Sequence, residues 1–305
     1  MITPKKLFPG ARVALVGTSG PVPDGRLEDA VKAVEGLGLV PVVYESAKSV
    51  HGYLSGADAL RAADLNAAFA DDTIDGVLPI RGGYGAHRLM ELLDYDMIKK
   101  HPKYFAGYSD VTALSIAFNE LCGFVTYHTI MPSTEYYKAE MDDYSMDYLK
   151  RAMFGSLSGV IAPPPGRDLP ETFVPGKARG ILCGGNLSLV QQSVGTPYAI
   201  DTKDRILFLE DVGEKPYRVD AMLTQLKNSG KLKECAGIVL GYYTDCAAEN
   251  PEKSLSLYEV FSEVIKPLGI PCMMNLSCGH DVPTCALPLG GMAELDATNA
   301  TLTIL

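Results

Sequence analysis

The sequence has no tryptophan, only five histidines, and no run that approaches the ~20 apolar residues of a membrane span. Its first ten residues include two lysines but no apolar stretch behind them, so no secretory signal is expected. Basic residues are in deficit, because 37 Asp and Glu stand against 27 Lys and Arg, a formal net charge of −10. A phosphate backbone is bound by clustered basic side chains. The sequence therefore predicts neither a nucleic acid partner nor a membrane partner.

The seven cysteines form no disulfide framework, because their number is odd and they are scattered from Cys122 to Cys285. This usage suits a reducing compartment, and we expect a cytoplasmic protein. The C-x-x-C pairs and the H-E-x-x-H helix that mark zinc sites are also missing. We therefore expect no metal and no cofactor.

What is present is a globular composition, with 47% hydrophobic and 21% charged residues. In the first half, short runs rich in Val, Ile and aromatic residues are typical of buried parallel strands: Arg12 to Gly17, Leu39 to Glu45, Gly76 to Arg81, Tyr104 to Tyr108 and Phe124 to Ile130. Amphipathic helical patterns lie between them: Leu27 to Leu37, about Ala57 to Ala70, and about Asp110 to Leu121. This alternation predicts right-handed crossovers and a doubly wound parallel sheet.

The pattern changes at Val160 to Lys177, which carries five prolines and no periodicity, as a connection between domains does. We therefore predict two α/β domains, residues 1–163 and residues 164–305. In the second, strand-like runs cover residues 179–182, 205–212, 237–242 and 271–277, and helical patterns cover 187–194, 217–226 and 257–268. The final residues, 292–305, alternate around a turn and predict a hairpin.

A candidate nucleophile lies in Gly107-Tyr108-Ser109-Asp110, which ends one predicted strand and opens a helix. A sharp turn there pushes the Ser109 side chain out of the sheet, and the helix N-terminus directs free N–H groups at an oxyanion. The alternative is an ordinary helix N-cap, because Val111 stands where the hydrolase motif G-x-S-x-G has its second glycine.

A second candidate is the glycine turn Arg81-Gly82-Gly83-Tyr84-Gly85, which also follows a strand. Residues without Cβ let the backbone approach a ligand, so the turn could supply an oxyanion donor or hold a carboxylate. The spacing fits neither nucleotide-binding glycine motif. A plain turn with Arg81 in a surface ion pair is the alternative.

A serine nucleophile requires a base and an acid that orients it. His280 is the best base, because it follows an apolar strand and precedes a loop with proline. Glu210, at the end of another buried strand, is the candidate acid. A solvated His280 and a loop-capping Glu210 stay open as alternatives. Cys278 could act as a thiol nucleophile, but a buried cysteine is usually a small hydrophobe.

These segments resemble the LD-carboxypeptidases, a family of serine peptidases that includes the muramoyltetrapeptide carboxypeptidases and the microcin C self-immunity proteins. The matching segments are RGGYG at 81–85, GYSDVT at 107–112, CGGNLSL at 183–189, LEDVGEKPYRVD at 209–220 and CGHDVPTCALPLG at 278–290. They occur in the family's order and span nearly the whole chain. The resemblance implies a flavodoxin-like N-terminal domain with a parallel sheet and a smaller C-terminal α/β domain, with the catalytic site across their interface.

The resemblance implies that Ser109 is the nucleophile, Glu210 the orienting acid and His280 the base. It also implies an oxyanion hole made by the backbone N–H groups of Asp110 and one glycine of the turn, for which we choose Gly83. We expect Arg81 and Gly82 to contribute to substrate binding, through a charged or a backbone contact to a terminal carboxylate.

The implied activity is removal of the terminal D-alanine from murein tetrapeptides in peptidoglycan recycling, by an enzyme that is commonly a homodimer. A first alternative is hydrolysis of peptidyl or aminoacyl adenylates, as in microcin immunity. That branch stacks the nucleotide base on an aromatic residue, usually tryptophan, which this chain lacks, although Tyr136 or Tyr137 could substitute. A second alternative is a non-catalytic protein that binds a small ligand.

Overall fold

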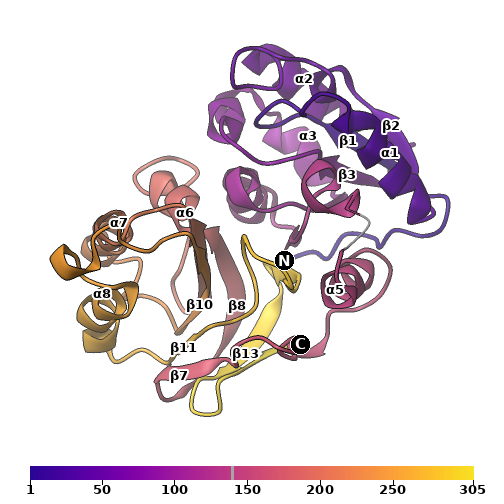
Figure 1. Ribbon diagram of the computed structural model, residues 1–305. Helices are drawn as coiled ribbons and strands as arrows, with labels where there is room; N and C mark the ends of the chain where they lie inside the picture. Colours follow the sequence, from indigo (N-terminus) through magenta and orange to yellow (C-terminus); the bar gives the residue numbers. More distant parts are fainter. Residues whose placement is uncertain (139–140) are drawn as a thin grey trace. The chain divides into compact units, whose positions relative to one another are not determined.

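The computed structural model describes residues 1–138 and 141–305, which form two compact units (Figure 1). Unit 1 comprises Met1–Leu157 together with Ala286–Leu289, and unit 2 comprises Ser158–Cys285 together with Gly290–Leu305. The division after Leu157 precedes the expected one at residue 163, because β6 (Gly159–Val160) already pairs with β14 (Thr301–Ile304) of unit 2. The sequence pattern also gave no sign that residues 286–289 return to unit 1.

Unit 1 is built on a parallel sheet with the strand order β2-β1-β3-β4. Its strands are β1 (Arg12–Val16), β2 (Val40–Val43), β3 (Gly76–Pro79) and β4 (Tyr104–Phe105). All three pairings are parallel, which confirms the predicted α/β class, and the order 2-1-3-4 is that of flavodoxin-like sheets.

The fifth predicted strand is present, but most of its pairing is with a partner that the sequence did not predict. β5 (Thr126–His128) forms an antiparallel ladder with β12 (Leu287–Leu289), and a single parallel bridge, Ala106 with Tyr127, links it to the residues that follow β4. The antiparallel partner of β5 thus comes from a segment far along the chain, where the sequence pattern predicted no strand of this unit.

The helices of unit 1 are α1 (Arg26–Gly36), α2 (Asp58–Ala70), α3 (Tyr95–Lys100), α4 (Thr112–Ala117) and α5 (Asp143–Phe154). Shorter helical turns are η1 (Glu45–Ala47), η2 (Ala86–Leu92), η3 (Ser109–Val111), η4 (Phe118–Cys122) and η5 (Pro132–Tyr136). Four buried phenylalanines, Phe69, Phe105, Phe118 and Phe124, pack ring against ring between α2, β4 and η4. The apolar faces predicted for the helices therefore do cover the sheet.

Unit 2 contains a mixed sheet of eight strands, in the order β6-β14-β13-β8-β9-β10-β11-β7. Its central strands, β8 (Lys177–Asn186), β9 (Ile206–Val212), β10 (Gly237–Thr244) and β11 (Cys272–Met274), are parallel to one another. The predicted terminal hairpin is confirmed as β13 (Met292–Asp296) and β14. Three helices, α6 (Leu187–Ser193), α7 (Pro216–Asn228) and α8 (Leu257–Val264), lie together on one side of this sheet (Figure 1). Two short turns, η6 (Pro251–Lys253) and η7 (Lys266–Leu268), flank α8.

The proline-rich segment contains more structure than predicted. β7 (Glu171–Val174) lies inside it and pairs antiparallel with β11 at the edge of the sheet. Pro170 and Pro175 flank this strand, and prolines at the ends of an edge strand cost no ladder bond. The prolines of this segment therefore flank an edge strand, in addition to marking the predicted connection between the domains.

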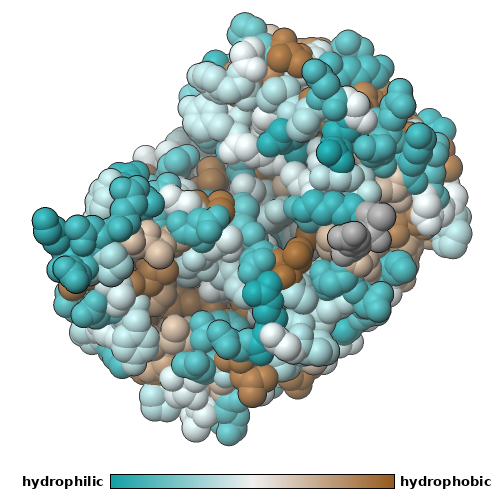
Figure 2. Space-filling view, in the orientation of Figure 1, coloured by the Kyte–Doolittle hydropathy of each residue, from teal (hydrophilic) through white to brown (hydrophobic). Residues whose placement is uncertain are grey.

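Hydrophilic residues predominate on the face drawn in Figure 2, with hydrophobic residues scattered between them. Within residues 1–138 and 141–305, no helix combines the length and the hydropathy needed to cross a membrane.

Candidate active site

Ser109 lies at a strained turn in unit 1, just after β4. Its backbone φ is 62°, a left-handed conformation that costs a non-glycine residue roughly 1–3 kcal/mol and is concentrated at functional sites. In the part of the chain that the structure describes, neither η3 nor α4 has a side-chain N-cap, so the capping alternative for Ser109 is not observed. The turn holds the serine in a conformation that capping does not explain.

The glycine turn packs directly against this serine. A Cβ on Gly82 would lie 3.0 Å from Ser109 Cβ and 3.2 Å from Ser109 Oγ, so any side chain there would crowd the serine. Gly20 donates its N–H to the Gly82 carbonyl at 3.2 Å. Because the Gly82–Gly83 peptide is trans, the N–H of Gly83 points away from Gly20. The sequence left open which glycine of the turn presents a donor, and Gly83 stays the predicted one.

Arg81 lies against the neighbouring loop rather than in an ion pair. Its Nη1 donates to the Pro21 carbonyl at 2.9 Å, and Arg81 forms no ion pair with any residue of the described ranges. The surface ion pair that was the alternative for this residue is therefore not observed. Its guanidinium keeps donors that no described side chain uses.

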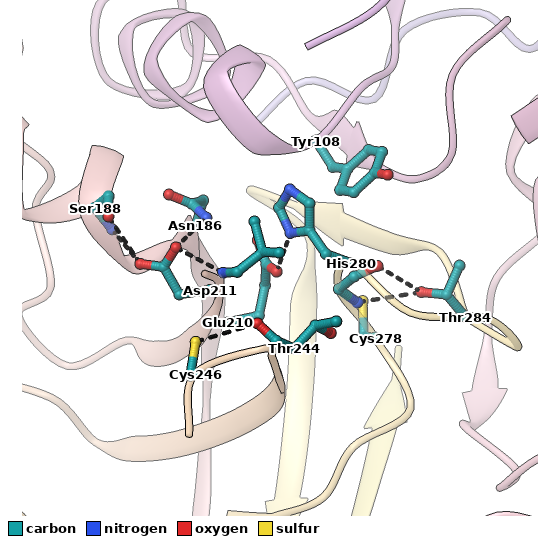
Figure 3. Close-up of polar contacts among 12 residues, drawn as sticks. Tyr108, Asn186, Ser188, Glu210, Asp211, Thr244, Cys246, Cys278, His280 and Thr284 are labelled. Carbon is teal, nitrogen blue, oxygen red and sulfur yellow. Dashed lines mark hydrogen bonds and ion pairs between the residues drawn. The ribbon is translucent and has the colours of Figure 1, made fainter. Parts of the chain in front are cut away.

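Unit 2 brings Glu210 and His280 together (Figure 3). Nδ1 of His280 lies 2.6 Å from Oε2 of Glu210, the carboxylate is fully buried and the imidazole is 12% exposed. β9 supplies Glu210, and the loop after β11 supplies His280. This contact excludes the solvated loop histidine and fixes which ring nitrogen faces the acid.

Glycines make the room for this buried pair. A Cβ on Gly279, whose φ is 135°, would lie 2.7 Å from Glu210 Oε2. A Cβ on Gly241 in β10 would lie 3.2 Å from Glu210 Cβ. Thr284 Oγ1 accepts the N–H of Gly279 at 3.1 Å, so it closes the loop that carries His280 (Figure 3). The glycines before His280 and in β10 thus have a specific steric role.

Asp211, next to Glu210, is a site-adjacent carboxylate that sequence reasoning missed. It accepts from Asn186 Nδ2 at 3.0 Å, and from the N–H and Oγ of Ser188 at 3.0 and 2.9 Å (Figure 3). Burial raises its pKa, and these hydrogen bonds oppose that rise. Asp211 therefore ties the start of α6 to β9. The segments that contain Asn186 and Asp211, CGGNLSL and LEDV, were matched to the family from the sequence, but neither residue was assigned a role.

Cys278 is fully buried, and its Sγ lies 3.5 Å from the Cys285 carbonyl. Burial raises the pKa of this thiol well above its usual value, so it stays protonated at neutral pH and is a poor nucleophile. Within residues 1–138 and 141–305, no group of three or more His, Cys, Asp or Glu side chains is placed to hold a metal ion.

We expect Cys278→Ala to retain turnover of the same order as the wild type, because the buried thiol supplies no thiolate. Stability should fall by about 1 kcal/mol from the lost packing. Cys235→Ala removes another buried thiol of unit 2 and is the matched control. Steady-state rates and thermal unfolding of the two variants test this; loss of turnover in folded Cys278→Ala alone would make the thiol the nucleophile.

The predicted residues thus gather in two groups. Ser109, Asp110, Gly82, Gly83 and Arg81 belong to unit 1, and Glu210 and His280 belong to unit 2. Strained or buried polar groups at the ends of parallel strands are the arrangement found in α/β enzymes.

Comparison with protein families places this chain among the peptidases. The model of the LD-carboxypeptidase N-terminal domain matches residues 13–129, and that of the LD-carboxypeptidase C-terminal domain matches residues 179–295. A protein of Bacillus subtilis (strain 168) named "Probable murein peptide carboxypeptidase" is 39% identical over 303 residues, which cover 99% of this chain and 93% of that protein. The chain belongs to the LD-carboxypeptidase family.

Two solved structures are similar over nearly the whole chain. An MccF-like protein from Bacillus anthracis str. Ames has a TM-score of 0.89 at 28% identity, covering 100% of this chain and 99% of that one. A muramoyltetrapeptide carboxypeptidase from Oxalobacter formigenes has a TM-score of 0.84 at 27% identity, covering 96% and 98%. The predicted family and fold class are confirmed.

Proposed function

We propose that this protein is a serine LD-carboxypeptidase that removes the terminal D-alanine from murein tetrapeptides. The bond cleaved joins the L-centre of diaminopimelate or lysine to the D-residue. The observation that carries the proposal is the contact between the buried Glu210 carboxylate and His280 Nδ1. A carboxylate on Nδ1 fixes the tautomer that leaves Nε2 as the base, which is what a serine nucleophile requires.

In the proposed reaction, Ser109 Oγ attacks the carbonyl carbon of the L-centre as its proton passes to His280 Nε2. His280 then gives that proton to the departing amine of D-alanine, and an acyl-enzyme remains. Water, deprotonated by His280, releases the tripeptide and restores Ser109. Glu210 holds the imidazolium throughout, which is the ordinary division of roles in a serine triad.

The backbone N–H groups of Asp110 and Gly83 are the proposed donors to the tetrahedral oxyanion. Two observations support this choice. Gly82 packs against Ser109, which brings the turn to the serine, and the bond from Gly20 to the Gly82 carbonyl leaves the Gly83 N–H pointing away from Gly20. One such donor is typically worth about 10²- to 10³-fold in kcat. Arg81 uses Nη1 to bind the Pro21 carbonyl and has further guanidinium N–H groups. It is proposed to bind the terminal carboxylate with them, together with the backbone at Gly82.

A second candidate is hydrolysis of aminoacyl or peptidyl adenylates, which the similarity to an MccF-like protein favours. The absence of tryptophan counts against it, since the adenine ring would have only tyrosine faces for stacking. The two candidates differ in whether a free C-terminal carboxylate is needed.

Amidation of the terminal D-alanine is expected to lower kcat/KM by about one to two decades, because a charge-assisted bond worth roughly 1.5–3 kcal/mol is lost. L-alanine in its place should cost as much, since inversion moves either the methyl group or the carboxylate. The tetrapeptide, its amide, its L-alanine epimer and an aminoacyl sulfamoyl adenosine are compared on one preparation. Equal hydrolysis of tetrapeptide and amide contradicts the carboxypeptidase proposal, and hydrolysis of the adenosine compound alone establishes the second candidate.

The biological setting is part of the same proposal. A murein tetrapeptide specificity places the enzyme in peptidoglycan recycling. Homodimer formation, which the family resemblance implies, and a cytoplasmic location, which the cysteine usage suggests, stay predictions. Light scattering of the purified chain tests the first.

A further inference from the structure

Arg61 is a fully buried arginine that belongs to neither predicted group. It lies in α2, and its Nη1 donates to the Thr18 carbonyl at 2.5 Å and to the Gly85 carbonyl at 3.0 Å. Its Nη2 contacts Asp58 Oδ1 at 2.5 Å. An arginine with no exposed surface is rare, and it is costly unless its donors are used. The groups that bind the Arg61 guanidinium therefore indicate the role of this buried charge.

One of these carbonyls belongs to the glycine turn, and the other belongs to the loop that contacts it. Thr18 lies two residues before Gly20, whose N–H holds the Gly82 carbonyl at 3.2 Å. Gly85 ends the turn with a φ of 119°, and a Cβ there would lie 3.1 Å from Arg61 Nη1. One guanidinium therefore contacts the end of the turn at Gly85 and, at Thr18, the loop whose Gly20 bonds Gly82.

The peptide between Gly85 and Ala86 is held at both of its polar atoms. Its carbonyl oxygen accepts from Arg61, and its N–H, which belongs to Ala86, donates to Asp110 Oδ2 at 2.7 Å. A cation on the oxygen and a carboxylate on the N–H both favour one orientation of the peptide dipole. Asp110 directly follows Ser109, so this peptide links the glycine turn to the turn that carries the serine.

We propose that Arg61 is a positioning residue for the oxyanion site: it holds the glycine turn against the Ser109–Asp110 turn so that the Gly83 and Asp110 N–H groups converge. The inference rests on the proposed function only in that the oxyanion donors come from these two turns. The Arg61 side chain has no exposed surface, so it acts through the turn and not by contact with substrate. Lysine cannot replace it, because Nη1 bonds the two carbonyls while Nη2 contacts Asp58, and a lysine has only one nitrogen to take both places.

The test compares Arg61→Lys and Arg61→Met with Arg88→Met. Arg88 contacts the same Asp58, at 2.8 Å, but its side chain is exposed and contacts neither Thr18 nor Gly85 in the structure. Three measurements are made on each folded protein: kcat and KM on the tetrapeptide, the rate of reaction with a fluorophosphonate, and hydrogen exchange of the amides of residues 82–86. In the probe reaction Ser109 Oγ forms the P–O bond as fluoride leaves and the hydroxyl proton passes to His280, and the phosphoryl oxygen occupies the oxyanion position.

Both Arg61 variants should lose about 10- to 100-fold in kcat and in the fluorophosphonate rate, with KM little changed, as a small misplacement of reacting groups does. Exchange of the Gly83 to Ala86 amides should rise in them and stay at the wild-type level in Arg88→Met. If Arg61 has only a structural role, its variants should have a lower thermal midpoint of unfolding but no selective loss of kcat over KM. Wild-type exchange and wild-type probe rate in both Arg61 variants would overturn the inference.

The readouts separate this inference from the proposed function. If the wild type reacts with the fluorophosphonate but leaves the tetrapeptide intact, the substrate proposal fails while slow probe reaction of the Arg61 variants still supports the positioning role. If the wild type does not react with the probe, hydrogen exchange alone decides: exchange that rises only in the Arg61 variants supports the hold on the turn, and unchanged exchange refutes it.

Discussion

Ser109→Ala is expected to lower kcat on the murein tetrapeptide by about 10⁴- to 10⁶-fold, the range typical of a lost triad nucleophile. The fold should persist, because the hydroxyl makes no cap to η3 or α4 in the described part of the chain. Ser109→Gly should be equally inactive but more stable than Ser109→Ala by roughly 1 kcal/mol, since glycine relieves the φ of 62°. Rates and thermal unfolding are measured on both variants.

Ser115→Ala is the matched control for this prediction. It removes a buried hydroxyl from α4, and Ser115 Oγ has no hydrogen-bond partner among the residues that the structure describes. Its turnover should match that of the wild type. Near wild-type turnover in a folded Ser109→Ala protein would eliminate the serine mechanism.

His280→Ala is expected to cost a similar factor, and Ser109→Ala/His280→Ala no more than either single change, because triad members act as a unit. Glu210→Gln should cost less, about 10³- to 10⁴-fold, since an orienting carboxylate contributes through the tautomer. Steady-state kinetics of the wild type, Ser109→Ala, His280→Ala and their double variant form a double-mutant cycle, and Glu210→Gln is measured beside it. The cycle also tests whether a residue of unit 1 and a residue of unit 2 act in one reaction.

His101→Ala is the control for loss of an imidazole, because His101 Nδ1 contacts the exposed Asp72 at 3.3 Å on the surface of unit 1. It should leave kcat unchanged. If the double variant loses the product of the two single factors, Ser109 and His280 act independently and the triad proposal is refuted.

Much of the parallel architecture was predictable, because continuous apolar runs and one-sided helices are local patterns. β1 and α1 lie close to where those patterns placed them. The pairing of β5 was not predictable, since its partner β12 comes from residues 287–289, far along the chain. β7 was missed because the prolines around it masked a four-residue edge strand.

The site shows the same division between local and long-range information. Ser109 and Gly82 could be shortlisted from their strand ends, but the positive φ that distinguishes Ser109 from a capping serine is a property of the folded turn. Glu210 and His280 are 70 residues apart in sequence, so their contact leaves no local mark. Arg61 could not be found, because an arginine in an alanine-rich amphipathic helix is ordinarily exposed.

Mass spectrometry of the products from a murein tetrapeptide tests the central claim most directly, with wild type and Ser109→Ala run side by side. The wild type should release one D-alanine and leave the tripeptide that ends in diaminopimelate or lysine. Ser109→Ala should leave the tetrapeptide intact over the same time. Cleavage at another bond, an intact tetrapeptide with the wild type, or the same products from both proteins would contradict the claim.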